Sequence, residues 1–314
     1  MLEAREFAGW TCGENSRFER LQARAEDGAQ LQVYRTQPDA GLPALVFANA
    51  LGSPARVLEA FAHSVKDRLS LVTWDARCMP GPGLADFSRI TPAVHARDLV
   101  RVLDFCKLQS SVVAGWCTGA ETVLEAARWA PSRISLALLL NGDYSFRTQK
   151  NGEKGALTKA LFREIVAHPE EAPTYFEMLR RSPVARSCGD GAEEDAQLLE
   201  LVSAPARVDP EKLHRFAVMS NSFWSNSIED WVAEVACECH AFGAVHDVVA
   251  HVDSSRRISE LLRDCSLEIR PQMSHFSICY DSALHDRLAS LTQTRYERGV
   301  PTPELRVTAS SSFY

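Results

Sequence analysis

The chain of 314 residues is 46% hydrophobic and 24% charged, a composition that suits one large α/β domain or one domain carrying an insertion. Its net charge of −7, without a long run of lysine and arginine, argues against nucleic acid and against a basic membrane patch. The first residues lack a basic and apolar leader, and no stretch reaches the roughly 18 apolar residues of a membrane span, so we expect a cytoplasmic protein. In such a protein the nine cysteines are expected to be free thiols.

The first predicted element is a β-hairpin at a sheet edge. Residues 18–36 alternate polar and apolar side chains on both sides of Asp27 and Gly28, which is typical of two strands joined by a tight turn. From Pro43 onward, short apolar runs alternate with amphipathic patterns, which predicts a parallel sheet covered by helices on both faces. The predicted strands cover residues 44–49, 70–75, 110–116 and 134–142, and the predicted helices cover residues 53–69, 91–108 and 118–130.

The alternating pattern breaks after Asn141. Residues 145–227 are charged, partly helical and free of buried strand runs, so they are predicted to form a helical cap. The predicted core then consists of residues 1–144 and 228–314. Its sheet pattern resumes with strands at 239–245 and 266–271 and helices at 253–264 and 282–298. We therefore predict an α/β fold, with a mostly parallel sheet flanked by helices and an inserted helical cap.

The sequence Gly115-Trp-Cys117-Thr-Gly119 ends an apolar strand and opens a helix. This is the context of a nucleophile elbow, a sharp turn whose small flanking residues let the backbone close beneath the nucleophile. A thiol at a helix N-terminus also gains electrostatic help in ionising, and the thiolate is its reactive form. The pattern predicts Cys117 as a nucleophile, against the alternative of a core cysteine in an ordinary strand-to-helix turn.

A nucleophile in this position needs a base and an acid that orients the base, in the chain order nucleophile, acid, histidine. Asp247 follows the predicted strand at 239–245, and His275 follows the next strand, just before the last helix. We predict Asp247 and His275 as the acid and the base. His246 and His251 are nearby alternatives to His275, and Asp143, after the strand that follows the elbow, is the rival acid.

Stabilising an oxyanion requires two backbone N–H donors. One is predicted at Thr118, directly after the nucleophile, and the second in the loop after the strand at 44–49, at Leu51 or Ala50.

A second cysteine motif lies far from the elbow. The sequence "CECH" contains Cys237, Cys239 and His240, but it lacks a second half at zinc-ligand spacing. A strand entering the core is the favoured interpretation, and no metal site is predicted.

Together these motifs resemble the α/β-hydrolase superfamily over nearly the whole chain, roughly Leu31 to Tyr296. Most members carry serine at the elbow, so the cysteine in "GWCTG" narrows the resemblance. It is similar to dienelactone hydrolases, to polyhydroxyalkanoate synthases, and to aminoacyltransferases that move amino acids between carrier-protein thiols in syringomycin- or coronamic-acid-type nonribosomal peptide assembly. A capped chain of 314 residues looks most like the aminoacyltransferases. Asn49-Ala50 departs from the His-Gly found in many relatives, which weakens the assignment of the oxyanion loop.

The resemblance implies transfer of a thioester-linked acyl or aminoacyl group through a Cys117 acyl-enzyme. It implies no bound cofactor, and partners that are carrier proteins bearing phosphopantetheine. Exchange between thioesters is nearly equal in free energy, which favours a cysteine over a serine for reversible transfer. The alternatives are a thioesterase or dienelactone-type hydrolase with the same three residues, and a non-catalytic binding protein. An acidic carrier would need a local basic patch, for which Arg180, Arg181 and Arg186 are candidates.

Overall fold

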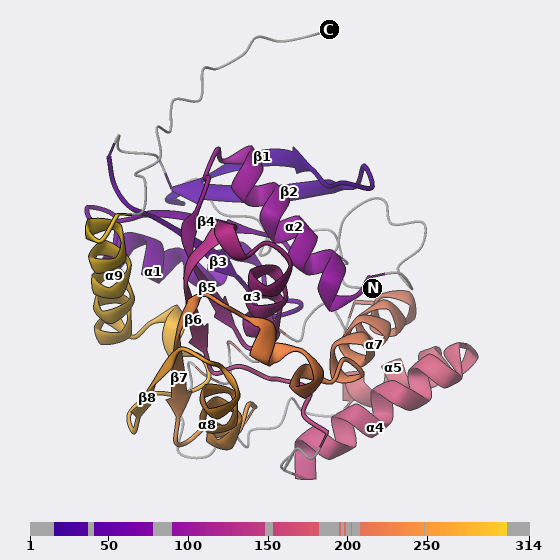
Figure 1. Ribbon diagram of the computed structural model, residues 1–314. Coiled ribbons are helices and arrows are strands. Elements are labelled where there is room, and N and C mark those ends of the chain that lie inside the picture. Colours follow the sequence, from indigo (N-terminus) through magenta and orange to yellow (C-terminus); the bar gives the residue numbers. More distant parts are fainter. Residues whose placement is uncertain are drawn as a thin grey trace, which may run out of the picture.

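The computed structural model describes residues 16–36, 41–77, 90–147, 153–181, 208–247 and 249–299, and the single residues 195, 198 and 202. Arg186 lies outside the described residues. One twisted sheet runs through the molecule, with helices on both sides of it (Figure 1). No helix in the described part of the chain is both long and apolar enough to cross a membrane.

The sheet has eight strands in the order β1-β2-β4-β3-β5-β6-β7-β8. β1 and β2 form the predicted antiparallel hairpin, and Gly28 in its turn has a φ of +86°, a conformation that favours glycine. β2 pairs antiparallel with β4, and the remaining pairings are all parallel. The strands are β1 (Phe18–Arg24), β2 (Gln30–Thr36), β3 (Ala44–Ala48), β4 (Ser70–Trp74), β5 (Ser111–Trp116), β6 (Ile134–Leu140), β7 (Glu238–Ala244) and β8 (Cys265–Arg270).

The order of the parallel strands reverses between β3 and β5. From β3 the chain adds β4 on one side, then crosses back to add β5 on the other side and continues outward through β6. Ala48 and Trp116, at the carboxyl ends of β3 and β5, therefore lie where the crossovers leave in opposite directions. Open α/β sheets bind their ligands at this switch point.

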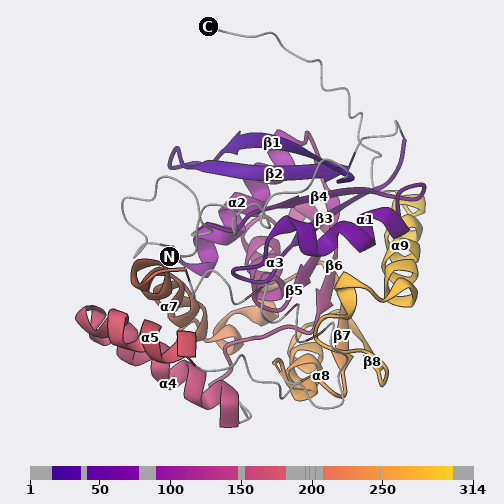
Figure 2. The ribbon, with the colours of Figure 1, turned by 180° about the vertical axis from the view of Figure 1, so that it is seen from behind.

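Helices cover both faces of the sheet (Figures 1 and 2). On one face α2 (Pro92–Phe105) contacts α3 (Thr118–Trp129), and α8 (Val252–Leu261) packs against β7 and β8. On the other face α1 (Glu59–Ser64) contacts α9 (Ser282–Glu297). The alternation of apolar strands with amphipathic helices thus yields the predicted fold class.

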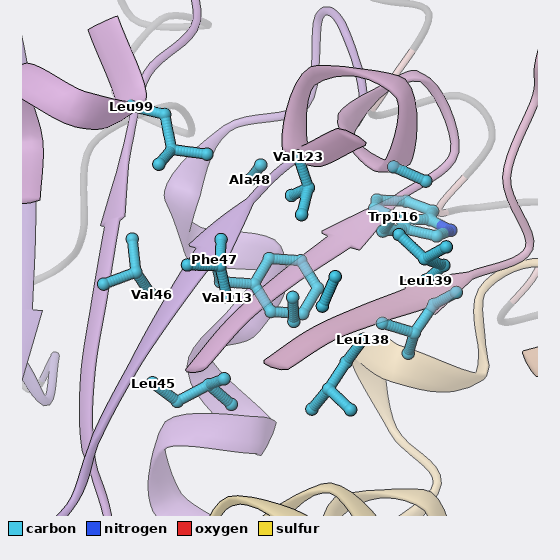
Figure 3. Close-up of a cluster of buried hydrophobic side chains, with 14 of the residues drawn as sticks. Leu45, Val46, Phe47, Ala48, Leu99, Val113, Trp116, Val123, Leu138 and Leu139 are labelled. Atoms are coloured by element: carbon cyan, nitrogen blue, oxygen red, sulfur yellow. The ribbon is translucent and has the colours of Figure 1, made fainter. Parts of the chain in front are cut away.

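The core lies between the central strands and these helices. Figure 3 shows Phe47 of β3, Val113 of β5 and Leu138 of β6 packed together, with Val123 of α3 above the strands. Phe47, Val113, Leu138 and Val123 have no exposed surface. Each such side chain contributes about 2 kcal/mol by leaving water, which holds the carboxyl ends of the central strands in fixed positions.

One predicted helix is shorter than its sequence pattern. Residues 53–69 form a 3₁₀ turn, Ala55–Leu58, and then α1. The helix ends after Ser64 because Val65, with a φ of −105° and a ψ of 8°, leaves the helical conformation. The Arg68 and Leu69 amides then donate to the carbonyl of Val65, at 2.9 Å, just before β4.

Between β6 and β7 the helices α4 (Glu153–Ala167), α5 (Ala172–Arg181) and α7 (Pro210–Trp224) lie together in both views. They share a small apolar cluster that is separate from the main core and contains Phe162, Ile165, Ala172, Leu213 and Ala217. The two ends of the insertion meet, because the Ile228 amide donates to the carbonyl of Ser145 at 3.2 Å. We call these three helices the cap; its bounds at 145 and 227 stay a prediction.

Candidate active site

Cys117 occupies a strained turn between β5 and α3. Its φ of 56° and ψ of −124° lie outside the regions that non-glycine residues ordinarily adopt. The turn is held on both sides, since the Cys117 amide donates to the carbonyl of Leu140 at 3.0 Å and its carbonyl accepts from Ala120 at 3.1 Å. Backbone strain of this kind persists only where the surroundings fix it, and it concentrates at functional sites.

The two glycines of the motif let the backbone close around this turn. A Cβ added at Gly115 would lie 2.4 Å from the carbonyl oxygen of Gly119, and one added at Gly119 would lie 2.1 Å from that of Ala48. Neither distance is possible for a real side chain. The glycine spacing in the sequence is therefore a steric requirement of packing α3 against the ends of β5 and β3.

The structure brings His275 and Asp247 together. Asp247 follows β7 and His275 follows β8, and Nδ1 of His275 lies 2.7 Å from Oδ2 of Asp247. The other carboxylate oxygen, Oδ1, accepts from the backbone amides of Val249 and Ala250 at 2.7 and 2.8 Å. Both side chains are almost completely buried. Asp247 thus orients the imidazole and is itself held by its own loop.

The imidazole of His275 lies near enough to the Cys117 thiol for each group to shift the pKa of the other. Burial raises the pKa of Cys117, and the contact with His275 offsets this only in part. Burial opposes a charged imidazolium, but the carboxylate of Asp247 and the Cys117 sulfur outweigh it and hold the pKa of His275 well above its ordinary value. Burial thus makes the thiol harder to ionise than a free cysteine, and the imidazole whose proton affinity Asp247 increases is the group placed beside it to exchange a proton.

Two side chains that sequence reasoning missed hold the histidine loop. Nε1 of Trp116 donates to the carbonyl of His275 at 2.8 Å, and Nδ2 of Asn141 donates to the carbonyl of Ser274 at 2.9 Å. Asn141 has a φ of 45°, so its left-handed backbone directly after β6 turns the side chain toward this loop. The only available sequence signals were the position of Trp116 beside the nucleophile and the Asn-Gly pair after β6.

The alternative residues have other partners. The rival acid, Asp143, accepts a hydrogen bond from Nε1 of Trp224 at 3.3 Å, although its charge reaches Cys117 and raises the pKa of the thiol. His251 begins α8, where its Nδ1 accepts from the amide of Asp253 at 3.2 Å, and its side chain is exposed. His246 is also exposed.

The predicted oxyanion donors lie side by side. Thr118 is the first residue of α3, where an amide has no partner within its own helix. The Leu51 amide, however, donates to Oγ1 of Thr118 at 2.8 Å. Leu51 is thus engaged in this structure, and Ala50 is the alternative second donor that the same loop provides.

The cap touches the loops that carry these groups. The ring of Phe216 in α7 lies against Gly52 in the loop after β3. Asp195, in the same insertion but outside these three helices, accepts hydrogen bonds from Ser274 at 3.1 Å and from Tyr280 at 2.8 Å. Cys117 itself is 8% exposed.

A further cap contact brings a cation to the site. Nζ of Lys159 in α4 lies 5.2 Å from the ring centre of Trp224, the residue that donates to Asp143. Burial lowers the pKa of Lys159, and the charges of Asp143 and Cys117 act in the opposite direction.

Within the described residues, no group of three histidine, cysteine, aspartate or glutamate side chains could hold a metal ion. In the "CECH" segment, Cys237 directly precedes β7, and Cys239 and His240 lie in β7. His240 lies 2.7 Å from Oγ of Ser266 on β8.

No family model matches the sequence, and no curated protein matches it significantly. Solved structures do resemble it. An esterase from Exiguobacterium antarcticum has a TM-score of 0.69 at 14% identity, covering 88% of this chain and 100% of that one. A hydrolase from Pseudomonas aeruginosa has a TM-score of 0.64, and the enol-lactonase from Burkholderia xenovorans LB400 has 0.63, each at 17% identity over 88% of this chain and 98% of its own.

The chain has the α/β-hydrolase fold. Cys117, Asp247 and His275 follow β5, β7 and β8, in the chain order nucleophile, acid, histidine that was expected from the sequence. Their roles in a reaction stay a prediction. The α/β-hydrolase architecture predicted from the sequence is thus confirmed.

Proposed function

We propose that this protein is an acyltransferase with a cysteine nucleophile, which moves a thioester-linked acyl or aminoacyl group between carrier-protein thiols. Cys117 carries the acyl group, His275 transfers protons and Asp247 fixes the imidazole tautomer. The observation that carries the proposal is the buried chain of contacts from the Cys117 thiol through His275 to Asp247. A protein that only binds a ligand would not need a thiol, an imidazole and a carboxylate in series at a strained turn.

The first half-reaction follows from this geometry. His275 takes the thiol proton while the Cys117 sulfur attacks the thioester carbonyl, and the amide of Thr118 faces the developing oxyanion. The carbon–sulfur bond to the donor then breaks, and the departing thiolate receives the proton from the imidazolium. Cys117 now carries the acyl group, and the donor leaves as a free phosphopantetheine thiol.

The second half-reaction repeats these steps with an acceptor thiol. His275 deprotonates the acceptor, whose sulfur attacks the acyl-enzyme, and Cys117 leaves and recovers its proton. Thioesters are made and broken in both halves, so the exchange is nearly balanced in free energy. The low exposure of Cys117 and His275, 8% and 4%, supports transfer because it limits the access of water to the acyl-enzyme.

The covalent step is tested by intact-protein mass spectrometry with an acyl or aminoacyl thioester donor. The chain is expected to gain one acyl group, which Cys117→Ala removes. Cys106→Ala is the matched control, because that buried cysteine lies at the C-terminal end of α2. An adduct that persists in Cys117→Ala would rule out this nucleophile.

Transfer and hydrolysis are separated by the fate of the acyl group. The enzyme is incubated with an aminoacyl-loaded carrier protein, with and without a second carrier that bears a free phosphopantetheine thiol. A transferase loads the acceptor faster than free acid accumulates, and its acyl-enzyme persists when no acceptor is present. Rapid release of acid in both samples would instead establish a thioesterase or lactone hydrolase.

Hydrolysis is the second candidate function because the fold neighbours include an esterase and an enol-lactonase. Water activated by His275 would release the acyl group from the same intermediate. A third possibility, a non-catalytic binding protein, predicts a Cys117 no more reactive toward iodoacetamide than the other buried thiols. Selective labelling of Cys117 by iodoacetamide would contradict that possibility.

A further inference from the structure

Three of the described cysteines lie at the edge of the sheet opposite Cys117. Cys237 directly precedes β7, Cys239 is the second residue of β7, and Cys265 is the first residue of β8. Because β5, β7 and β8 run parallel, their amino ends share one edge, whereas Cys117 follows the carboxyl end of β5. A strand of seven residues spans roughly 20 Å, so these thiols form a cluster separate from the candidate active site.

The thiol of Cys239 lies against the backbone of Cys237. Cys237 lies in the bend that leads into β7, and Sγ of Cys239 lies 3.4 Å from the carbonyl oxygen of Cys237. Each of the two thiols also acts on the pKa of the other. Cys265 is the register partner of Cys239 on the neighbouring strand. All three are free thiols.

The surroundings give the two thiols of the pair different character. Cys239 is 1% exposed, whereas Cys237 is half-buried and so within reach of a small molecule. The hydrogen bond from Cys239 lowers the pKa of Cys237, and the guanidinium of Arg295 adds to this; the same contact raises the pKa of Cys239. Nη1 of Arg295 lies 3.2 Å from Glu238, and its buried Nε has no hydrogen-bond acceptor in the described part of the chain.

We propose that Cys237 and Cys239 form a redox-active dithiol site for small disulfides such as oxidised glutathione, with Cys237 as the attacking thiol and Cys239 as the resolving thiol. The juxtaposition of an accessible thiol in the bend before β7 and a buried thiol two residues later carries this assignment. It is independent of the chemistry at Cys117.

The exchange proceeds in two steps. The Cys237 thiolate attacks one sulfur of the small disulfide, breaks its S–S bond and releases one small thiol, which leaves a mixed disulfide on Cys237. Cys239 then loses its proton and attacks the Cys237 sulfur, which closes the intramolecular disulfide and releases the second small thiol. Two protein thiols are oxidised while one small disulfide is reduced to two thiols.

The test uses the full chain carrying Cys117→Ala, so that the candidate nucleophile does not contribute. The protein is treated with oxidised glutathione, quenched with acid, digested without reduction and mapped by mass spectrometry. We expect a Cys237–Cys239 disulfide. Added Cys237→Ser should abolish it, whereas Cys239→Ser should leave a stable mixed disulfide on Cys237. Cys106→Ser, which removes a buried thiol at the end of α2, is the control and should change nothing.

A second measurement does not require the disulfide to close. Phenylarsine oxide bridges two neighbouring thiols and releases water, so one phenylarsenic group per chain should bind and should be lost in both Cys237→Ser and Cys239→Ser. Near-ultraviolet circular dichroism checks that each variant is folded, and Cys237→Ala replaces a serine variant that is not. Arsenical binding that is unchanged in either folded variant, or a disulfide mapped to Cys239 and Cys265, would overturn the assignment.

Discussion

At the scale of single residues, the candidate active site depends on how burial and charge act on one thiol and one imidazole. Burial favours the neutral forms of both groups, and Asp247 reverses this balance at His275 alone. The consequence is a thiol that holds its proton more tightly than a free cysteine, beside an imidazole whose affinity for a proton Asp247 increases. A buried neutral thiol is also protected from oxidation, whose rate follows thiolate character and exposure.

The carboxylate of Asp247 can be tested with a nearly isosteric change. In Asp247→Asn the amide oxygen still accepts from Val249 and Ala250, while the amide nitrogen replaces the oxygen that accepts from Nδ1 of His275. The fold should persist, but the imidazole loses the partner that fixes its tautomer. We expect kcat for acyl transfer to fall by about 10⁴-fold, measured by steady-state kinetics with a thioester donor.

The control for this prediction is Asp143→Asn. Asp143 accepts from Trp224 of the cap, so its loss should reduce kcat much less than the loss of Asp247. If Asp143→Asn is the more damaging change, the acid follows β6 and Asp247 only shapes its loop.

At the scale of elements, the turn from β5 to α3 is the most constrained part of the site. α3 begins against β3, and its first turn carries Glu121, which is completely buried. The carboxylate of Glu121 accepts hydrogen bonds from Asn226 at 2.9 Å and from Ser145 at 3.4 Å, at the two ends of the insertion. α3 therefore positions the nucleophile at its N-terminus and also holds the two chain segments where the insertion begins and ends.

The steric role of the elbow glycines predicts a large effect on stability. In Gly119→Ala the new methyl group would overlap the backbone of Ala48, which cannot move without breaking the pairing of β3 with β5. We expect the free energy of unfolding to fall by about 3 kcal/mol, measured by urea denaturation. Gly28→Ala, in the open hairpin turn, meets no atom within 4 Å and should cost about 1 kcal/mol for its positive φ alone. Equal losses in the two variants would contradict this packing argument.

Glu121 predicts an unusual dependence of stability on pH. Burial raises the pKa of Glu121 from 4.5 to about 8, against the effect of its hydrogen bond from Asn226. Between these two values the folded state holds a proton that the unfolded state releases, so this group makes stability fall as pH rises. We expect the free energy of unfolding to fall by about 1.4 kcal/mol per pH unit across this window. Above the high end of the window Glu121 should cause no further loss.

The matched variant is Glu121→Gln, which keeps the shape but cannot ionise. Urea denaturation at several values between pH 5 and pH 8, with the range chosen from the pKa above, should show a smaller decline with pH in Glu121→Gln than in the unsubstituted chain. Parallel curves would show that Glu121 titrates normally.

At the scale of the whole molecule, charge bears on the proposed carrier partner. The chain carries a net charge of −7, so an acidic carrier would approach against the overall field. Two of the arginines predicted to form a docking patch, Arg180 and Arg181, end α5, and both lie near Glu177, at 3.0 and 3.7 Å. Glu177 neutralises part of the patch and leaves a local excess of one positive charge.

Docking through this patch predicts an effect that depends on salt. Replacing both Arg180 and Arg181 by glutamate should lower the second-order rate of transfer from an acidic carrier by about tenfold at low salt, and by less at high salt. The rate with a small pantetheine thioester should not change. Arg256→Glu on α8 is the control, since Arg256 is an exposed arginine that also pairs with an acidic side chain. A rate from the carrier that is unchanged at every salt concentration would exclude this docking surface.

The sequence by itself determined the fold class and nominated the candidate site residues. Apolar strand runs and the Gly115-x-Cys117-x-Gly119 spacing are local consequences of strand burial and backbone sterics. Both patterns can therefore be recognised from the sequence alone. Chain order and strand ends were enough to nominate Asp247 and His275.

Only the tertiary structure decided which of the nominated groups meet, because contacts across a sheet depend on strand order and loop paths that local patterns do not encode. In the folded chain the imidazole of His275 contacts Asp247, whereas Asp143 accepts from Trp224. The Leu51 amide donates to the hydroxyl of Thr118. The tertiary structure also set the direction of the pKa shift of the Cys117 thiol, because the burial that raises this pKa arises only when the core packs around the elbow. A sequence names the ionisable groups, but the desolvation and charge that each one experiences exist only once the chain is folded.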